Sequence, residues 1–287
     1  MFVVSGVSGN TGSVVARTLL AQEKPVTVLV RDPNKGGEWK AKGAQVAVAP
    51  LEDAGAVARA LAGAEGAYLL VPPNYRSENL LAEQAVVVDA LAKAVAQSGV
   101  PHVVLLSSVG AQHEQGTGPI VTVHRAERAI GPAARNFTAL RASFFLENWA
   151  GNVQGVVQQG VLHNFLTPDR KIPMIATADI GRFAAACLLN PAKGRRVLDL
   201  AGPADYSPRD IANGFAEQLG KPVRLETHPL AAVEPVLTGT GMPAGMARLF
   251  HEMYEGIESG LVAAEGTGEL LRGETPASAV IARLLGK

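Results

Sequence analysis

Three glycines near the N-terminus have the spacing expected of a phosphate-binding turn. The segment Gly6-Val-Ser-Gly9-Asn-Thr-Gly12 follows the apolar start of the chain and precedes the apolar stretch Val14–Leu20. A strand, a tight turn and a helix in this order aim backbone N–H groups and a helix N-terminus at a dinucleotide pyrophosphate. Gly6 allows the sharp turn, Gly9 the approach of the phosphates, and Gly12 close packing of helix on strand. The predicted cofactor-binding residues here are Gly6, Ser8, Gly9, Asn10, Thr11 and Gly12.

The spacing G-x-x-G-x-x-G differs from the G-x-G-x-x-G of most dehydrogenases, and the alternative is an ordinary glycine-rich turn. The next apolar run, Val26–Val30, ends in Arg31 and Asp32. At this point of such a unit an acidic residue bonds a ribose 2′-hydroxyl, whereas an arginine accommodates a 2′-phosphate. Arg31 follows the strand directly, and Asp32 precedes a proline, which is typical of a turn. With Lys35 nearby, NADP(H) is favoured over NAD(H), which stays possible. The alternative for Arg31 is a solvated loop charge.

Apolar runs and helical segments alternate through the first half of the chain, which predicts βαβ units. The expected strands are Val46–Ala49, Ala67–Val71, Val103–Leu106 and Phe137–Arg141, and the expected helices are Asp53–Leu61, Ser77–Ser98 and Ile120–Ile130. Continuous apolar strands indicate a parallel sheet covered on both faces. Ligands of such sheets bind outside the carboxyl ends of the strands. That rule adds as candidate site residues Val71, Pro72, Pro73, Ser107, Ser108, Ala142, Ser143, Phe144 and Phe145, of which Val71, Pro72, Pro73, Ser143, Phe144 and Phe145 are expected to bind the cofactor.

After about Leu146 this alternation gives way to helical stretches with a few short strands, such as Val197–Leu200 and Val223–Leu225. We therefore expect a Rossmann-type α/β fold, a doubly wound parallel sheet in residues 1–145, and a smaller, mostly helical substrate lobe in residues 146–287. A segment near residues 175–201 is expected to return to the main sheet, so the two parts are interleaved.

Aromatic side chains gather just after the last main strand. Phe144, Phe145 and Trp149 form the densest such group in a chain with 5% aromatic residues. They are expected to line an apolar pocket for a planar acceptor. The predicted substrate pocket consists of Tyr75, Phe145, Asn148 and Trp149. Core packing for at least one of these aromatics, and a surface position for Tyr75, are the alternatives.

Composition excludes several classes of protein. Lysine plus arginine and aspartate plus glutamate number 26 each, so nucleic acid is not an expected partner. No apolar run is long enough to cross a membrane, and the chain enters its first strand too early for a signal peptide. Cys187 is the single cysteine, which agrees with a reducing compartment. We expect a soluble, cytoplasmic enzyme of small molecules, a monomer or a homodimer.

Metal and hydrolase motifs are not found in the sequence. His251-Glu252-Met-Tyr-Glu255 starts like a zinc-protease motif but has a glutamate where the second histidine belongs. No other segment has the spacing of metal ligands, so no metal is expected. The G-x-S-x-G elbow of serine hydrolases is also missing.

Taken in order, several short motifs resemble the NmrA-like group of atypical short-chain dehydrogenases over nearly the whole chain. They are the glycine turn, Val30-Arg31-Asp32, Ser107-Ser108-Val-Gly110, His124-Arg-Ala-Glu127, Arg141-Ala-Ser-Phe-Phe-Leu-Glu-Asn148, Thr177-Ala-Asp179-Ile and Thr275-Pro276. Within the group the likeness is to NAD(P)H:quinone oxidoreductases and triphenylmethane-dye reductases. The resemblance implies a Rossmann domain, an NADPH cofactor and reductase activity. It equally implies a rival, a dinucleotide-binding redox sensor that regulates a partner without turnover.

One departure from the wider family bears on the chemistry. Short-chain dehydrogenases generally carry Tyr-x-x-x-Lys on the helix after the serine strand, and here that helix reads Ile120-Val-Thr-Val-His124. Reduction of an ordinary ketone without a positioned acid is slow. A quinone or a cationic dye accepts hydride without a proton from the enzyme. The sequence therefore favours such electrophiles and disfavours a nucleotide-sugar epimerase.

The resemblance also implies two catalytic residues. His124 stands at the lysine position and is expected to donate to the ribose hydroxyls or the cofactor amide. Ser107 is expected to bond the nicotinamide amide or the substrate. The alternatives are a polar residue on a helix surface for His124 and a turn former for Ser107.

Overall fold

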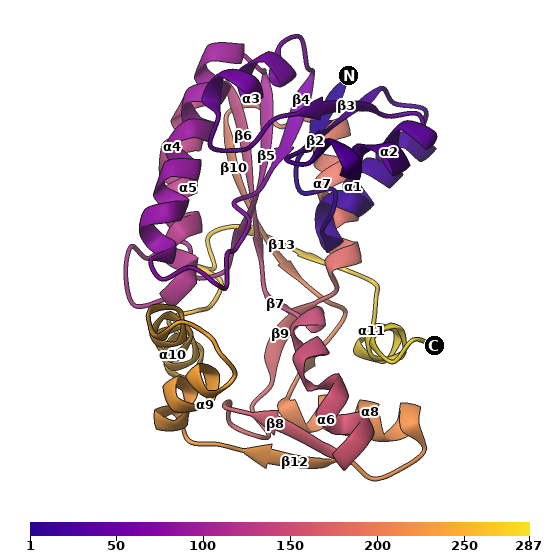
Figure 1. Ribbon diagram of the computed structural model, residues 1–287, viewed down its shortest axis with the longest axis vertical. Helices are drawn as coiled ribbons and strands as arrows, with labels where there is room; N and C mark the ends of the chain where they lie inside the picture. The colour runs from indigo at the N-terminus through magenta and orange to yellow at the C-terminus, as the bar shows by residue number, and fades with distance from the viewer.

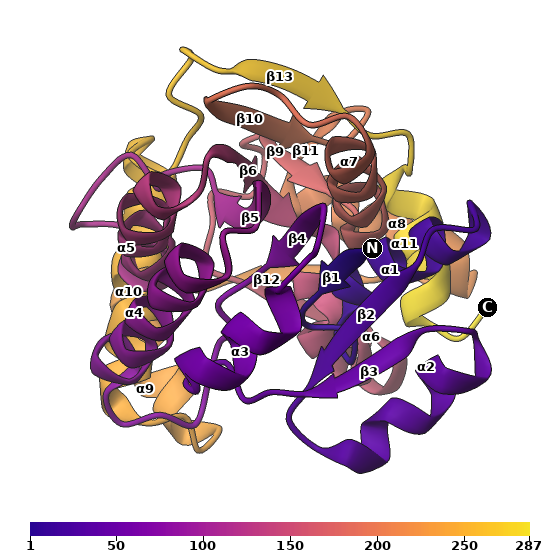
Figure 2. The same cartoon turned by 90° about the horizontal axis from the view of Figure 1, so that it is seen from above.

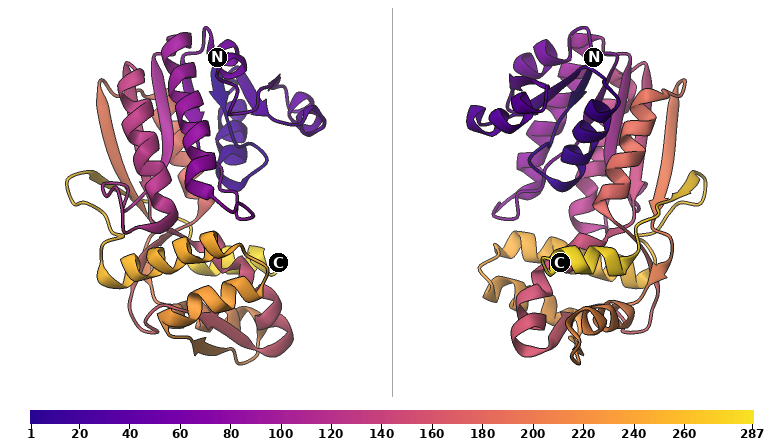
Figure 3. Two further views of the ribbon diagram at one scale, coloured as in Figure 1. Left: turned by 60° about the vertical axis from the view of Figure 1, so that its left-hand side comes forward. Right: turned by 90° about the vertical axis from the view of Figure 1, so that its right-hand side faces the viewer.

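The structure is a computed structural model that describes residues 1–287. A larger lobe built on one long sheet stands above a smaller lobe of short helices and strands (Figure 1). The two lobes face each other across the lower end of the sheet, as the side views also show (Figure 3). None of the helices is both long enough and apolar enough to cross a bilayer.

The larger lobe contains an eight-stranded sheet whose paired strands are all parallel. Its strands in spatial order are β13 (Glu269–Arg272), β10 (Arg195–Ala201), β6 (Asn136–Ala142), β5 (His102–Ser108), β4 (Gly66–Leu69), β1 (Phe2–Val4), β2 (Val26–Val30) and β3 (Gln45–Val48). Every residue of β1, β2 and β4 is buried, which is the reason these segments read as continuous apolar runs.

Helices cover both faces of this sheet. One face carries α1 (Asn10–Ala21) and α7 (Thr177–Leu189), and the other carries α3 (Ala54–Leu61), α4 (Leu80–Ser98) and α5 (Val121–Ile130) (Figure 2). Alternate residues of one strand therefore enter different cores. Phe2 and Val4 pack with α1 and α7, whereas Val3 packs with α3 and α4. The Rossmann-type fold class expected from the sequence is confirmed.

The chain returns to the main sheet twice after residue 145. The segment of residues 175–201 supplies α7 and β10. A second return, β13, pairs with β10 and was not expected. The sequence signal of β13 is weak because three of its four residues, Glu269, Leu270 and Arg272, are exposed on this edge strand.

The smaller lobe is less purely helical than expected, since it includes two small sheets of three and two strands. Its elements are β7 (Phe144–Phe145), the 3₁₀ helix η4 (Leu146–Asn152), α6 (Val153–Gln159), β8 (Val161–Asn164), β9 (Ile172–Ile175), β11 (Asp205–Tyr206), α8 (Pro208–Leu219), β12 (Arg224–Thr227), α9 (Val233–Gly239), α10 (Ala244–Ser259) and α11 (Ala277–Leu284). The remaining helix, α2 (Gly37–Ala41), lies beside β3.

Expected and observed boundaries differ most at one helix. The expected helix Ser77–Ser98 begins only at Leu80, because the side chain of Asn79 caps it by accepting from the Ala82 N–H at 3.3 Å. Its end agrees with the expectation, since Gly99 adopts φ 66° after Ser98. The expected strand Val223–Leu225 is Arg224–Thr227.

Candidate functional site

The glycine turn joins β1 to α1 with little room for side chains at two of its glycines. Gly6 has φ +67°, and a Cβ there would lie 2.5 Å from Leu70 Cδ2. A Cβ on Gly12 would lie 2.4 Å from the Ser5 carbonyl oxygen, which belongs to the backbone and cannot move aside cheaply. These are the sharp turn and the close helix packing that the spacing predicts.

Gly9 differs from its two neighbours because the space above it is open. A Cβ there would meet only the Gly6 carbonyl oxygen, at 3.4 Å, within a 4 Å radius. Gly9 is also the N-cap of α1, and no side chain caps this helix end. The first N–H groups of α1 thus lack intrahelical or side-chain acceptors, and the helix dipole makes this end positive. A dinucleotide pyrophosphate fits a cradle of this kind, which a side chain on Gly9 would fill.

The side chains of the turn divide into anchored and free ones. Thr11 is buried, and its hydroxyl accepts a hydrogen bond from Tyr68 Oη of β4 at 2.9 Å. The Thr11 side chain is therefore anchored to β4, whereas the side chains of Ser8 and Asn10 are exposed. Burial raises the pKa of the Tyr68 phenol. Tyr68 was not among the residues expected at the site; the signal in the sequence is a tyrosine inside an otherwise apolar central strand.

Arg31 lies exposed at the carboxyl end of β2 and has no ion-pair partner. The neighbouring Asp32 is committed to the turn, because its side chain accepts from the Asn34 N–H at 2.9 Å. The prediction that Asp32 starts a turn is confirmed. Lys35 lies in the same turn, so two cations and one occupied carboxylate surround this strand end.

Strand order brings the other predicted cofactor residues to the same edge of the sheet. Since β1, β4 and β5 are neighbours in the sheet, the glycine turn lies beside the segment after β4 and the end of β5. In that segment Val71 is buried, and the Pro72 carbonyl accepts from Gln84 Nε2 at 3.0 Å, while Pro73 is exposed.

Ser107 occupies a different environment from the one expected. Its side chain shares a face of β5 with Val103 and Leu105, under α4 and α5, because side chains alternate along a strand. The hydroxyl is 3% exposed and donates to Glu127 Oε1 of α5 at 2.6 Å. We correct the expected contact with the nicotinamide accordingly, since this hydroxyl is hydrogen-bonded to a carboxylate in the protein interior.

Glu127 is the centre of a buried ion network. Arg141 of β6 binds its carboxylate in two places, with Nε–Oε1 and Nη2–Oε2 distances of 2.9 Å, and Arg195 adds a third contact at 3.1 Å. Arg141 also donates to Glu265 at 2.9 Å. Burial disfavours the charged guanidinium, but the bonds to Glu127 and Glu265 outweigh burial and raise the pKa of Arg141. This network ties α5 to the edge of the sheet.

Asp199 lies beside this network without joining it. It pairs with Arg141 in the register of β10 and β6, is 3% exposed, and leaves Oδ1 without a hydrogen-bond partner. Burial raises the pKa of the Asp199 carboxyl, with the Arg141 charge acting in the opposite direction.

His124 is hydrogen-bonded to the segment that follows β5. Its Nδ1 lies 2.8 Å from the Ala111 carbonyl oxygen, which can only accept, so Nδ1 carries the hydrogen and Nε2 is free. The ring lines a surface depression of about 700 Å³ together with Arg128, Leu261 and residues 112–116. No other predicted cofactor residue lines this depression. The structure therefore does not bring His124 together with the glycine turn, and its contact with the cofactor stays a prediction.

The expected substrate residues do not form one cluster. Trp149 is 6% exposed and belongs to the core of the smaller lobe, with its ring 6.0 Å from that of Phe144. The core-packing alternative is thus the correct one for Trp149. Asn148 is exposed, Phe145 is half-buried against the main core, and Tyr75 is 52% exposed with its ring 5.9 Å from Phe250.

Two buried polar atoms near this segment have no hydrogen-bond partner, Ser143 Oγ and Trp149 Nε1. Ser143 follows β6 directly, at the edge of the sheet where the other cofactor candidates lie. A buried hydroxyl without a partner is costly unless a ligand or water completes it, so Ser143 keeps its place among the candidates. Glu147 of η4 was missed in the sequence. Its carboxylate accepts from the N–H of Thr177 at 3.0 Å and from its hydroxyl at 2.7 Å, which joins the smaller lobe to the start of α7.

Comparisons with known proteins agree with this architecture. A model of the NmrA-like family matches residues 1–262 of the chain. An NAD(P)H azoreductase of Xenophilus azovorans is 26% identical over 254 residues, which cover 88% of this chain and 86% of that protein.

Two solved structures show the same fold. One is an NADPH-dependent quinone oxidoreductase of Escherichia coli complexed with NADPH, with a TM-score of 0.81, 22% identity and 99% of each chain covered. The other is a triphenylmethane reductase of Citrobacter sp. complexed with NADP(H), with a TM-score of 0.78, 19% identity and 99% of each chain covered.

Proposed function

The chain belongs to the NmrA-like family, and we propose that it is an NADPH-dependent reductase that transfers a hydride to a quinone-like or dye-like electrophile. The observation that carries this proposal is the open cradle over Gly9 at the uncapped start of α1, beside the unpaired Arg31. The names of the relatives, an azoreductase, a quinone oxidoreductase and a triphenylmethane reductase, support the class of acceptor.

Each part of the cradle has a defined task in this proposal. The backbone N–H groups of the turn and of the first turn of α1 bind the pyrophosphate. Arg31, with Lys35, pairs with the ribose 2′-phosphate, since both cations lie free at the end of β2. Bound NADPH supplies the hydride. Ser143 completes its hydrogen bonding on the cofactor, and the smaller lobe provides the surface on which the acceptor lies.

The choice of acceptor follows from the missing acid. The helix α5 carries no tyrosine. Tyr68 of β4 is buried and bonded to Thr11, and Tyr75 lies exposed next to Phe250. The Ser107 hydroxyl donates a hydrogen bond to the Glu127 carboxylate. Acceptors that hold the added charge themselves, such as a quinone or a cationic dye, need no proton in the transition state, whereas a ketone does.

A redox sensor that binds NADPH without turnover is the second candidate. One observation favours it. Ser107 and His124, the residues expected to act in catalysis, each use a side-chain polar atom in a hydrogen bond within the protein.

Oxidation of NADPH, followed by absorbance against quinones, azo dyes, triphenylmethane dyes, enones and simple ketones, separates these candidates. We expect turnover with at least one quinone or dye and none with ketones. Tight NADPH binding with no turnover on the whole panel would instead select the sensor. Efficient ketone reduction would mean that an acid other than those described supplies the proton.

A further inference from the structure

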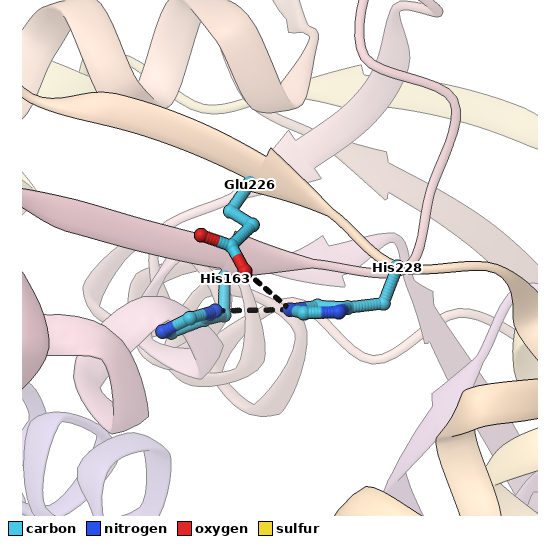
Figure 4. A group of neighbouring side chains, drawn as sticks. All are labelled: His163, Glu226 and His228. Atoms are coloured by element: carbon cyan, nitrogen blue, oxygen red, sulfur yellow. Dashed lines mark hydrogen bonds and ion pairs between the residues drawn. The ribbon is translucent and has the colours of Figure 1, made fainter.

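Two histidines and a glutamate, which come from two distant segments of the sequence, meet at the base of the smaller lobe (Figures 1 and 4). His163 lies on β8, Glu226 on β12, and His228 just after β12. The two strands are parallel neighbours that pair His163 with Glu226. His228 is fixed next to them because its N–H donates to the Asn164 carbonyl at 2.8 Å.

The distances within this group suit a metal ion. His163 Nδ1 lies 3.0 Å from His228 Nε2, and Glu226 Oε1 lies 3.8 Å from His228 Nε2. All the ligand atoms are within 4.8 Å of one another. Tetrahedral zinc with bonds of about 2.0–2.2 Å holds its ligand atoms roughly 3.3–3.5 Å apart. To reach this geometry the 3.0 Å pair would open by a few tenths of an ångström, and the widest pair, which lies within 4.8 Å, would close by up to about 1.4 Å.

The two imidazoles face each other through ring nitrogens. His163 Nδ1 lies 3.0 Å from His228 Nε2, and the ring centroids are 5.2 Å apart. Imidazole nitrogens are common zinc ligands. In Figure 4 the dashed contacts from His163 and from Glu226 end on the same ring nitrogen of His228.

Surrounding side chains hold these groups in place. Arg224 pairs with Glu226 Oε2 at 2.8 Å, which leaves Oε1 directed at His228. The side-chain oxygen of Asn152 accepts a hydrogen bond from the backbone N–H of His163 at 2.8 Å. The ring of Phe165 packs 5.8 Å from that of His228. Partners of this kind orient ligands in metal sites.

We propose that His163, Glu226 and His228 bind a borderline divalent metal ion, of which Zn²⁺ is the representative, with solvent at the remaining position. Imidazole nitrogens favour zinc, copper and nickel, and one carboxylate is compatible with all three. His163 is exposed and borders a depression of about 360 Å³ lined by Asn152 and glutamine side chains, which gives the ion a route of entry. The ion links β8 to β12. These two strands lie at the bottom of the smaller lobe, away from the carboxyl ends of the main-sheet strands (Figure 1).

The test uses the untagged full-length protein, freed of metal with a chelator and titrated with Zn²⁺ alone by calorimetry. We expect one equivalent to bind with micromolar or better affinity. His163→Ala and His228→Ala should each weaken this binding by about a hundredfold or more, and Glu226→Gln by about tenfold. The matched control is His251→Ala, because His251 also faces carboxylates, Glu234 at 3.0 Å and Glu255 at 3.6 Å, but has no second imidazole. It should leave Zn²⁺ binding unchanged.

Three further measurements keep the result independent of folding and of activity. Circular dichroism checks that each variant is folded. Co²⁺, a spectroscopic substitute, should give the intense visible absorption of tetrahedral coordination in the wild type and lose it in His163→Ala and His228→Ala. Zn²⁺ should also raise the melting temperature of the wild type but not of these variants. The proposal is overturned if no saturable Zn²⁺ binding occurs, or if His163→Ala and His228→Ala bind as the wild type does.

Discussion

The glycine turn and the Glu127 network both lie beside the main sheet, but they differ in hydrogen bonding: the polar groups of the turn lack partners, and those of the network have them. At the turn, the N–H groups that begin α1 have no side-chain cap, and Gly9 leaves open space above them. At the network, the Glu127 carboxylate is 2% exposed and is bonded by Ser107, Arg141 and Arg195.

This difference separates a binding surface from a scaffold. Unpaired backbone donors at a helix start are costly to bury without an acceptor, so a site that keeps them free is suited to an anionic ligand. A carboxylate that three side chains already bond has little capacity for a substrate, and it fixes α5 against the sheet instead. Residues of the turn should therefore change affinity, and residues of the network should change stability.

The largest effect is expected at the centre of the network. Glu127→Gln removes the charge that faces two arginines and leaves Arg141 partly unpaired in the interior, which should lower the free energy of unfolding by about 3–5 kcal/mol. Chemical denaturation measures this loss. Arg125→Ala is the control, because it breaks only the exposed pair with Asp89 and should cost about 1 kcal/mol or less. Equal small losses for both variants would remove the distinction between network and surface.

Gly9→Val should have the largest effect on affinity. The branched side chain fills the space above the turn, so NADPH binding should weaken by about a hundredfold or more while the melting temperature stays nearly unchanged. Calorimetric titration and a thermal melt report the two quantities separately. Gly37→Val is the control, since a Cβ there meets nothing within 4 Å. Retained binding in Gly9→Val, or loss only through unfolding, would contradict the assignment of Gly9.

Ser107→Ala tests whether Ser107 stabilises the fold through the Glu127 network or binds the cofactor. Loss of its bond to the Glu127 carboxylate should lower the free energy of unfolding by about 1.5–3 kcal/mol, with KM for NADPH unchanged. Denaturation and steady-state kinetics give both values. The opposite pattern, unchanged stability with a raised KM, would restore the expected contact with the nicotinamide.

Arg31→Ala tests whether Arg31 binds the ribose 2′-phosphate, because NADPH carries this group and NADH does not. Loss of a charge-assisted contact to the 2′-phosphate is expected to weaken NADPH by about 10–100-fold and NADH by less than about twofold. Arg135→Ala is the control, because Arg135 is exposed just before β6, at the amino end of the strands. Equal losses for both cofactors in Arg31→Ala, or tighter NADH than NADPH in the wild type, would be inconsistent with the assignment.

The smallest effect concerns pH and Asp199. Its carboxyl has a raised pKa through burial, so the folded state holds the proton more tightly than the unfolded state does. Stability from this group is therefore present at low pH and falls as the pH rises from the ordinary aspartate value through the raised one. Asp199→Asn should remove this slope and change stability at neutral pH by about 1 kcal/mol or less. Unfolding measured across acid pH in both proteins would show the slope, and an identical slope in the variant would contradict it.

How far the sequence could be interpreted depended on how local each feature is. Gly6, Gly9 and Gly12 act within one turn, and Asp32 accepts from a backbone N–H only two residues further on, so spacing alone predicted their backbone roles. Ser107 was placed at the correct strand end, but its direction depends on the pleat and on Glu127, twenty residues away.

Features assembled from distant segments were missed or misassigned. Trp149 looked like a pocket residue because the apolar core it joins comes from α8 and α11, much later in the chain. Edge strand β13 has too few buried residues to be recognised. The group of His163, Glu226 and His228 has no signature in the sequence, because pairing of β8 with β12 alone brings its members together.

Transfer of deuterium from NADPH labelled at both C4 positions to a triphenylmethane dye tests the central claim most directly. A hydride that passes straight from the cofactor forms a carbon–deuterium bond at the central carbon of the dye, and this bond does not exchange with water. Mass spectrometry of the colourless product should show one deuterium per molecule with the wild type, and much less product with Gly9→Val at the same NADPH concentration. Tight NADPH binding without any reduced dye, or a product that carries no deuterium, would contradict direct hydride transfer at this site.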